Sequence, residues 1–161
     1  MADLNIQEIW QLLDDIKDPE IPVVSIVEMG MVRDVRVDGQ KVTVSLSPTF
    51  AGCPALRVIQ EEVTRSLLEA GVGDADVRIT ISPSWSSEAI TPQARNKMKK
   101  IGLAPPPHHQ GSIELALMEP VSCPYCSSTN TSLKNDFGSS LCRAIYFCYN
   151  CQQPFEQFKP L

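Results

Sequence analysis

The first part of the chain changes repeatedly between helical and strand-like spacing of its apolar residues. In residues 5–16, apolar side chains recur every three or four positions, which predicts an amphipathic helix. Asn5 can cap the start of this helix, and Glu8 can return the hydrogen bond in a capping box. Pro19 and Pro22 cannot continue a helix, so we expect it to end at the turn "DPEIP".

Alternating apolar and polar residues predict strands at 32–37 and 41–47. The Asp-Gly dipeptide at 38–39 lies between them and is a strong hairpin signal. Residues 54–70 return to helical spacing, and residues 75–82 alternate again as a third strand. Helices and strands therefore both contribute to this part of the chain.

A short helix is predicted at 91–101, with Thr91 as its cap and Pro92 in its first turn. The segment "GLAPPPHHQGS" follows, and its consecutive prolines are typical of an extended, stiff spacer. We therefore predict a first domain at 1–103, a proline-rich linker at 104–112 and a cysteine-rich domain at 113–161.

The composition is that of a folded protein with an acidic balance. The chain has 161 residues, 43% of them hydrophobic, and a formal net charge of -5. A broad electrostatic grip on nucleic acid is therefore not expected, and no apolar run reaches the roughly 20 residues that span a bilayer. The N-terminus lacks the basic and apolar parts of a signal peptide. We expect a cytoplasmic protein, in which clustered cysteines indicate metal binding or reactivity before disulfides.

Four of the six cysteines form two C-x-x-C pairs. Cys123 and Cys126 make the first pair, Cys148 and Cys151 the second, and 21 residues separate the pairs. Two such turns can complete a tetrahedral ligand set, which suits zinc first and iron second. The alternatives are unrelated buried thiols and a redox pair, although neither pair opens a helix after a strand. About 40 residues bury little core, so we predict a structural four-cysteine zinc site that supplies folding energy.

Cys142 is the surplus thiol of this region. Residues 141–148 resemble a strand that leads into the second pair, which would place Cys142 roughly 20 Å from Cys148. Cys142 is therefore either a buried apolar filler or part of a second site.

Cys53 lies where the strand ending near residue 47 meets the helix at 54–70. Free backbone N–H groups and the helix dipole favour a thiolate at such a position, which can attack or bind a soft metal. The alternative is a small buried residue at a helix cap. Asp18 and Glu20 flank Pro19, and this stiff turn either directs carboxylates toward a metal or positive partner or reflects ordinary turn chemistry.

Other polar residues give weaker signals. His108 and His109 lie in the proline-rich segment, and we expect them to be solvated rather than metal ligands. Arg95 and the lysines after it make a basic helix, which we expect to be a solvated surface, with the docking of an acidic partner as the alternative.

Several segments carry a family resemblance. "DPEIPVVSIVEMGMV", followed by "TFAGCP" after a strand, resembles the metal–sulfur cluster biosynthetic family of iron–sulfur assembly. "SPSW", "GLAPP" and "CPYC…FGSSLC…CYNC" resemble the members encoded with the bacterial phenylacetate pathway. The resemblance covers nearly the whole chain. It implies an α/β (α+β) fold, with a small mixed sheet, flanking helices and a C-terminal rubredoxin-like zinc ribbon.

The resemblance also implies a site and a partner. Cys53 falls on the functional cysteine of the family, and Asp18, Glu20 and Thr49 fall on its accompanying motif. The implied partner is the phenylacetyl-CoA epoxidase, a di-iron oxygenase with a ferredoxin-type reductase component.

Two hypotheses follow. In the first, the chain is a maturation factor in which Cys53 transiently holds iron or an iron–sulfur cluster for the epoxidase. One thiolate cannot enclose a cluster, so a second ligand must come from Cys142 or from Cys53 of a second subunit in a homodimer. In the second, the chain is a non-catalytic structural subunit of the epoxidase. We expect no enzymatic activity of the chain itself and no nucleic-acid or membrane partner.

Overall fold

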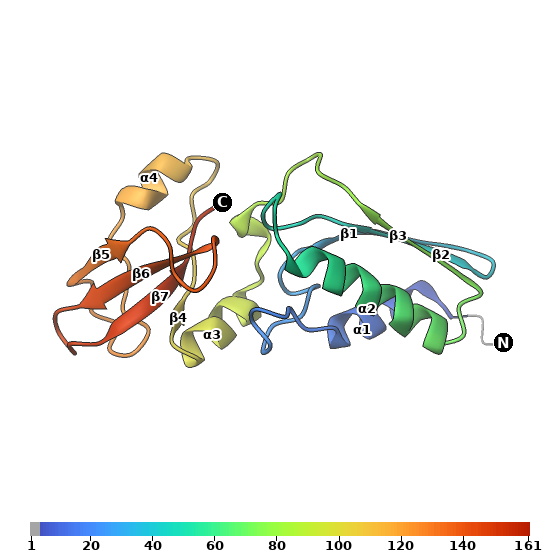
Figure 1. Ribbon diagram of the computed structural model, residues 1–161, viewed down its shortest axis with the longest axis horizontal. Helices are drawn as coiled ribbons and strands as arrows, with labels where there is room; N and C mark the ends of the chain where they lie inside the picture. Colours follow the sequence, from blue (N-terminus) through green and yellow to red (C-terminus); the bar gives the residue numbers. More distant parts are fainter. Residues whose placement is uncertain (1–3) are drawn as a thin grey trace. The chain divides into compact units, whose positions relative to one another are not determined.

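The computed structural model of the chain describes residues 4–161. The chain divides into two compact units, Met1–Trp85 and Ser86–Leu161 (Figure 1). No helix within residues 4–161 is both long and apolar enough to cross a membrane. The predicted domain bounds, 1–103, 104–112 and 113–161, were drawn from sequence composition, and they stay a prediction.

The first unit combines two helices with three strands. They are α1 (Ile6–Asp15), β1 (Val32–Asp38), β2 (Lys41–Leu46), α2 (Ala55–Glu69) and β3 (Asp74–Ile79). The sheet has the order β1-β2-β3 and is mixed, because β1 runs antiparallel and β3 parallel to β2. Both helices lie on one face of the sheet (Figure 1). The predicted small mixed sheet with flanking helices is confirmed.

Aliphatic side chains hold the helices against the sheet. The helices and the central strand β2 each bury one stripe of such side chains: Ile9, Leu13, Ile59, Val63, Leu67, Val42, Val44 and Leu46. Full burial of one aliphatic side chain contributes about 1.5–3 kcal/mol. These stripes therefore set the position of both helices over the sheet.

The ends of these elements follow local rules. The Asn5 side chain accepts from the backbone of Glu8 at 3.0 Å, and the Glu8 carboxylate accepts from Asn5 N at 2.8 Å, so the predicted capping box is confirmed. Gly39, at φ +59°, supplies the left-handed residue of the β1–β2 turn. Pro54 is the N-cap of α2 rather than its first helical residue, so α2 begins one residue later than predicted.

The second unit contains three short helical segments and a four-stranded sheet. They are η1 (Ser87–Ala89), α3 (Pro92–Lys100), β4 (Leu103–Ala104), α4 (Ile113–Met118), β5 (Thr131–Asn135), β6 (Arg143–Cys148) and β7 (Pro154–Phe158). The sheet has the order β4-β7-β6-β5. Thr91 caps α3 by accepting from Ala94 N at 3.2 Å, as predicted. The segments η1, β4, α4, β5 and β7 were not predicted from the sequence.

Buried Arg95 anchors the proline-rich segment within the second unit. Its guanidinium donates to the carbonyls of Ser87 at 2.7 Å and Ile90 at 3.3 Å, and also to the carbonyl of Pro106. The expectation that Arg95 forms part of a solvated surface is therefore wrong. Three backbone carbonyls replace water around its charge, which makes burial tolerable.

The two histidines of this segment have different environments. The His108 side chain is 67% exposed, whereas that of His109 is only 5% exposed. His109 Nδ1 accepts from Gly111 N at 3.1 Å, and its Nε2 lies 3.2 Å from Ser86 Oγ. The prediction of a solvated side chain is therefore wrong for His109, because the chain folds back onto η1.

We expect Arg95→Met to loosen the proline-rich segment without removing the fold. Loss of the guanidinium leaves backbone carbonyls without donors, which should lower the free energy of local opening by about 2 kcal/mol. Amide exchange near residues 103–109 should therefore become roughly thirty-fold faster. Hydrogen-exchange mass spectrometry of the zinc-loaded chain measures this. Lys100→Met, an exposed change on the same helix, is the control. Equal exchange in both variants would contradict the anchoring role.

Candidate functional site

Four cysteine sulfurs converge in the second unit. The Sγ atoms of Cys123, Cys126, Cys148 and Cys151 all lie within 4.8 Å of one another. Two of these separations, Cys123–Cys151 and Cys126–Cys148, are 3.6 Å. A tetrahedral zinc with Zn–S bonds of about 2.3 Å requires sulfur separations of about 3.8 Å. The four residues therefore fit one tetrahedral ion, and the chain carries a four-cysteine metal-binding group.

The two C-x-x-C turns have equivalent backbone geometry. Ser127 follows Cys126 with φ 62°, and Gln152 follows Cys151 with φ 59°. The chain therefore leaves both pairs through a left-handed residue. Cys123 and Cys148 are buried, whereas Cys126 is exposed. The group thus lies at the boundary between the core of the unit and solvent.

Asn150 contributes a polar contact that the sequence analysis missed. Its side-chain amide donates to Cys126 Sγ at 3.5 Å, and with other hydrogen bonds it lowers the pKa of Cys126 to about 6. Burial and the neighbouring thiols raise the pKa of Cys151 to about 12. Sulfurs packed this closely cannot all become thiolates without a cation between them. The position of Asn150 inside the second C-x-x-C pair was the available signal.

Cys142 lies directly before β6, outside the four-sulfur group. It is buried, and its Sγ lies 3.0 Å from Ser140 Oγ. Its backbone carbonyl accepts from Lys159 N at 2.9 Å. Burial fits the packing alternative, while a role for Cys142 as a second metal ligand stays a prediction.

Cys53 lies in the loop between β2 and α2, as the sequence predicted. Its backbone N–H donates to Phe50 O at 3.0 Å, and its carbonyl accepts from Leu56 N at 3.2 Å, so the loop enters the helix as a tight turn. The residue is partly exposed. Thr49 lies in the same loop and is also partly exposed. A partner can therefore approach Cys53 from solvent.

The turn that contains Asp18 and Glu20 lies near this thiol. Asp18 is buried, and its Oδ1 accepts from the backbone N–H groups of Glu20 at 2.8 Å and Ile21 at 3.1 Å. This is the turn chemistry that one sequence interpretation favoured for Asp18. The turn is also close enough for both carboxylates to act on the Cys53 thiol electrostatically. The structure thus brings together Cys53, Asp18 and Glu20.

The helix start does not make Cys53 acidic. Burial is the largest cause that raises the pKa of the Cys53 thiol, and the charges of Glu20 and Asp18 raise it further. Hydrogen bonds from the backbone of Ala55 and Leu56 lower the pKa but do not compensate. The net direction is opposite to the expectation of a stabilised thiolate, because that expectation omitted burial and the neighbouring carboxylates.

This arrangement favours a cation over an anion as the species that meets Cys53. A soft sulfur lies beside two carboxylates, so a positive ion is attracted while the thiol still holds its proton. Binding of a metal through sulfur requires loss of that proton.

Two family descriptions match the chain. Residues 6–81 match the family described as "Iron-sulfur cluster assembly protein", and residues 108–159 match "PaaD zinc beta ribbon domain". A crystal structure of a domain of unknown function, DUF59, from Bacillus anthracis is 28% identical, with a TM-score of 0.51, over 55% of this chain and 85% of that chain. A conserved hypothetical protein from Thermotoga maritima is 26% identical, with a TM-score of 0.53, over 61% of this chain and 98% of that one.

A curated protein of Escherichia coli K12 is similar over nearly the full length. It is described as a putative subunit of the 1,2-phenylacetyl-CoA epoxidase, and it is 37% identical over 159 residues, which cover 99% of this chain and 95% of that protein. The four-cysteine group lies inside the segment that matches the PaaD ribbon, and Cys53 lies inside the segment that matches the assembly proteins. The chain therefore belongs to the PaaD family, whose curated member in Escherichia coli is described as an epoxidase subunit.

Proposed function

We propose that this chain is a maturation factor for the phenylacetyl-CoA epoxidase, with an accessory role in phenylacetate catabolism in the cytoplasm. It would assist the assembly or delivery of an iron or iron–sulfur centre. The observation that carries the proposal is the partly exposed Cys53 thiol beside the carboxylates of Asp18 and Glu20. The family memberships of the two chain segments support it.

In this proposal Cys53 holds the iron transiently, and Asp18 and Glu20 attract it. Thr49, in the same loop as Cys53, belongs to the supporting motif of this site. A thiol whose pKa is raised binds metal weakly at neutral pH, because the metal must displace a proton. Weak binding suits a carrier, which has to release its cargo. A second sulfur, from Cys142 or from Cys53 of a second copy, would complete a cluster.

Zinc is the metal that we assign to Cys123, Cys126, Cys148 and Cys151. Four protein ligands leave no open coordination position, so this zinc would be structural. It would join the two C-x-x-C turns and supply folding energy to the second unit.

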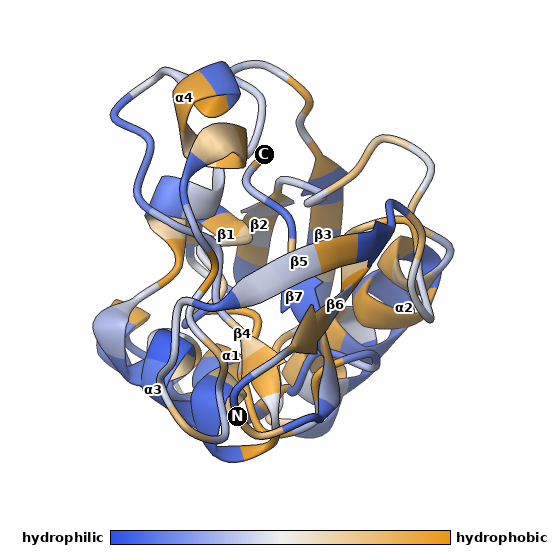
Figure 2. Cartoon of the chain, turned by 90° about the vertical axis from the view of Figure 1, so that its left-hand side faces the viewer, coloured by the Kyte–Doolittle hydropathy of each residue, from blue (hydrophilic) through white to orange (hydrophobic). Residues whose placement is uncertain are grey.

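A second candidate function is that of a non-catalytic structural subunit, and α4 favours it. Four of the six side chains of this helix are large, apolar and between 39% and 83% exposed: Ile113, Leu115, Leu117 and Met118. Figure 2 colours much of α4 as hydrophobic. Apolar side chains concentrated on so short a helix are typical of a surface that a partner covers, which here would be the epoxidase.

The zinc assignment predicts a clear difference between two cysteine variants. Protein purified without oxygen should contain about one zinc per chain. Cys148→Ser should lose this zinc, because the three remaining ligands bind the ion weakly. Without zinc to join the two C-x-x-C turns, the second unit should unfold. Cys142→Ser should keep the zinc. Metal analysis and circular dichroism test this, and equal zinc loss in both variants would refute the four-ligand set.

The carrier role predicts iron uptake that depends on Cys53. After anaerobic reconstitution with iron and sulfide, the wild-type chain should hold iron beyond the zinc site and Cys53→Ala should not. The uptake should tighten by about tenfold per pH unit from pH 7 to 9, because the raised pKa of Cys53 leaves a proton to displace throughout this range. Equal iron in both proteins, measured by metal analysis, would end the carrier proposal.

Complementation separates the two candidate functions. In a strain that lacks the native gene, Cys53→Ser should fail to restore ring oxidation if the chain is a maturation factor. Under the structural alternative, Cys53→Ser restores oxidation fully, whereas Leu115→Ser with Met118→Ser abolishes co-purification with the epoxidase. Phenylacetate consumption and co-purification from the same cells are the measurements.

A further inference from the structure

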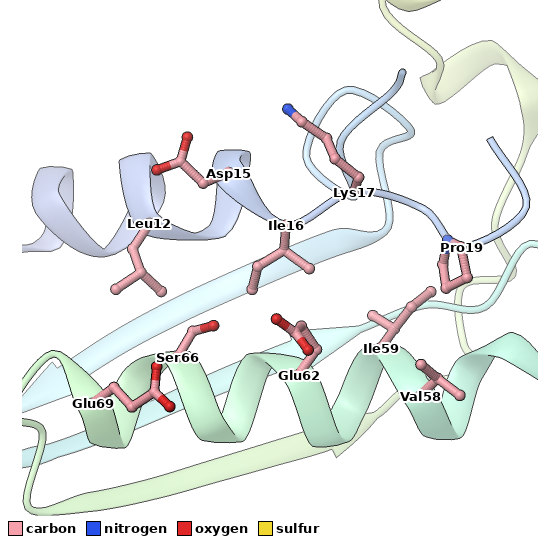
Figure 3. Close-up of a pocket in the computed structure, with 10 residues that line it drawn as sticks. All are labelled: Leu12, Asp15, Ile16, Lys17, Pro19, Val58, Ile59, Glu62, Ser66 and Glu69. Atoms are coloured by element: carbon pink, nitrogen blue, oxygen red, sulfur yellow. The ribbon is translucent and has the colours of Figure 1, made fainter. Parts of the chain in front are cut away.

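A groove runs between α1 and α2 in the first unit, with a volume of about 440 Å³ (Figure 3). Its floor is apolar, because the buried side chains of Ile16 and Ile59 line it. Leu12 extends the apolar surface at one end, and Val58, which is 54% exposed, extends it at the other. Exposed apolar surface in a concave site between two helices favours an apolar occupant.

The rim of the groove is acidic. Asp15 comes from α1, and Glu62 and Glu69 come from α2. Figure 3 shows Glu62, Ser66 and Glu69 on the side of α2 that faces α1. Arg65 pairs with Glu62 and lies 4.0 Å from Glu69, so it partly offsets these charges.

The acidic rim belongs to an acidic unit. Residues 1–85 contain 14 Asp and Glu against 7 Lys and Arg, a net charge of -7. Among the described residues that line the groove, Lys17 is the one basic side chain, and its Nζ donates to the carbonyl of Asp14 at 3.0 Å. The surroundings of the apolar floor thus attract positive charge and repel an anionic ligand or surface.

One end of the groove lies next to the proposed iron site. Pro19, which lines this end, stands between Asp18 and Glu20, whose charges act on Cys53. Val58 and Ile59 lie in the first turns of α2, the helix that begins directly after the Cys53 loop. A segment seated in the groove is therefore directed toward the thiol.

The dimensions favour a helix as occupant. From Val58 to Glu69 the groove follows twelve residues of α2, whose eleven rises span about 17 Å. A partner helix of three turns has this length, and two neighbouring helices offer a third helix a natural packing surface.

We propose that this groove docks an amphipathic, basic helix of a partner protein, with apolar side chains on the floor and Lys or Arg at the acidic rim. The inference rests on the proposed function, since it makes the groove the place where a recipient or donor of iron is held beside Cys53. It deepens that function by stating the chemistry of the partner segment.

The test uses a twelve-residue, fluorescein-labelled helical peptide of Leu and Lys, and a Leu and Gln peptide of the same pattern. Both are titrated against the zinc-loaded full chain by fluorescence anisotropy. The Leu/Lys peptide should bind at least about tenfold more tightly than the Leu/Gln peptide, and more weakly as salt rises. Equal binding of the two peptides, or no binding, overturns the proposal.

Paired variants on α2 locate the site. The variant Val58→Ser with Glu62→Lys, called the groove pair, should bind the Leu/Lys peptide about tenfold or more weakly than the wild-type chain does. Glu61→Lys with Leu68→Ser is the matched control, because Glu61 also pairs with an arginine and Leu68 is 50% exposed on the same helix. Unchanged zinc content and circular dichroism verify the fold. Equal weakening in both pairs overturns the proposal.

Two further measurements separate the alternatives. Sedimentation of the chain without peptide tests whether a second copy of the chain occupies the groove. If the wild-type chain is a dimer, and Val58→Ser with Glu62→Lys dissociates it while the control variant does not, the proposal of a partner helix is overturned. Iron reconstitution tests the proposed function by itself, because the groove pair should take up iron like wild type and Cys53→Ala should bind peptide like wild type. If the wild-type chain takes up iron through Cys53 but does not bind the Leu/Lys peptide, the groove alone is refuted. If it binds the peptide but takes up no iron that depends on Cys53, the carrier function is refuted.

Discussion

The aliphatic stripes of α1 and α2, buried against one face of the β1–β2–β3 sheet, determine where the chemistry of the first unit lies. They hold the end of β2 and the start of α2 close together, so the loop with Cys53 is short and tightly turned. They also hold the end of α1 beside α2, and the turn after α1 brings Asp18 and Glu20 to the thiol. A change in this packing would move the thiol, the carboxylates and the groove together, because all three depend on the same helix positions.

The second unit depends on its cysteines in a different way. Its small core contains Cys123 and Cys148 next to Ala104, Val121 and Phe155. Two ligands of the metal-binding group are thus also core residues, so the burial of apolar surface and the closing of the ligand set are one event. A core of this size contributes little by itself, and the metal supplies the remainder. The strand β4 joins this sheet through β7, which ties the proline-rich segment to the same core.

The sequence was most informative where local chemistry decides structure. The spacing of Ile9 and Leu13, the capping box at Asn5 and the two C-x-x-C pairs each depend on residues close in the chain, and the structure agrees with all of them. The burial of Arg95 and His109 could not be predicted in this way, because their partners are contributed by other segments. The predicted direction of the pKa shift of Cys53 was wrong for the same reason. The helix start is visible in the sequence, whereas the burial and the carboxylates that outweigh it arise only when the chain folds.

The raised pKa of Cys53 has a consequence for the reaction of this thiol with oxidants. Peroxide attacks the thiolate form of cysteine and reacts slowly with the protonated thiol. A cysteine that keeps its proton at neutral pH therefore resists conversion to sulfenic acid. The burial and the two carboxylates that raise the pKa of Cys53 would thus also protect its sulfur from oxidation.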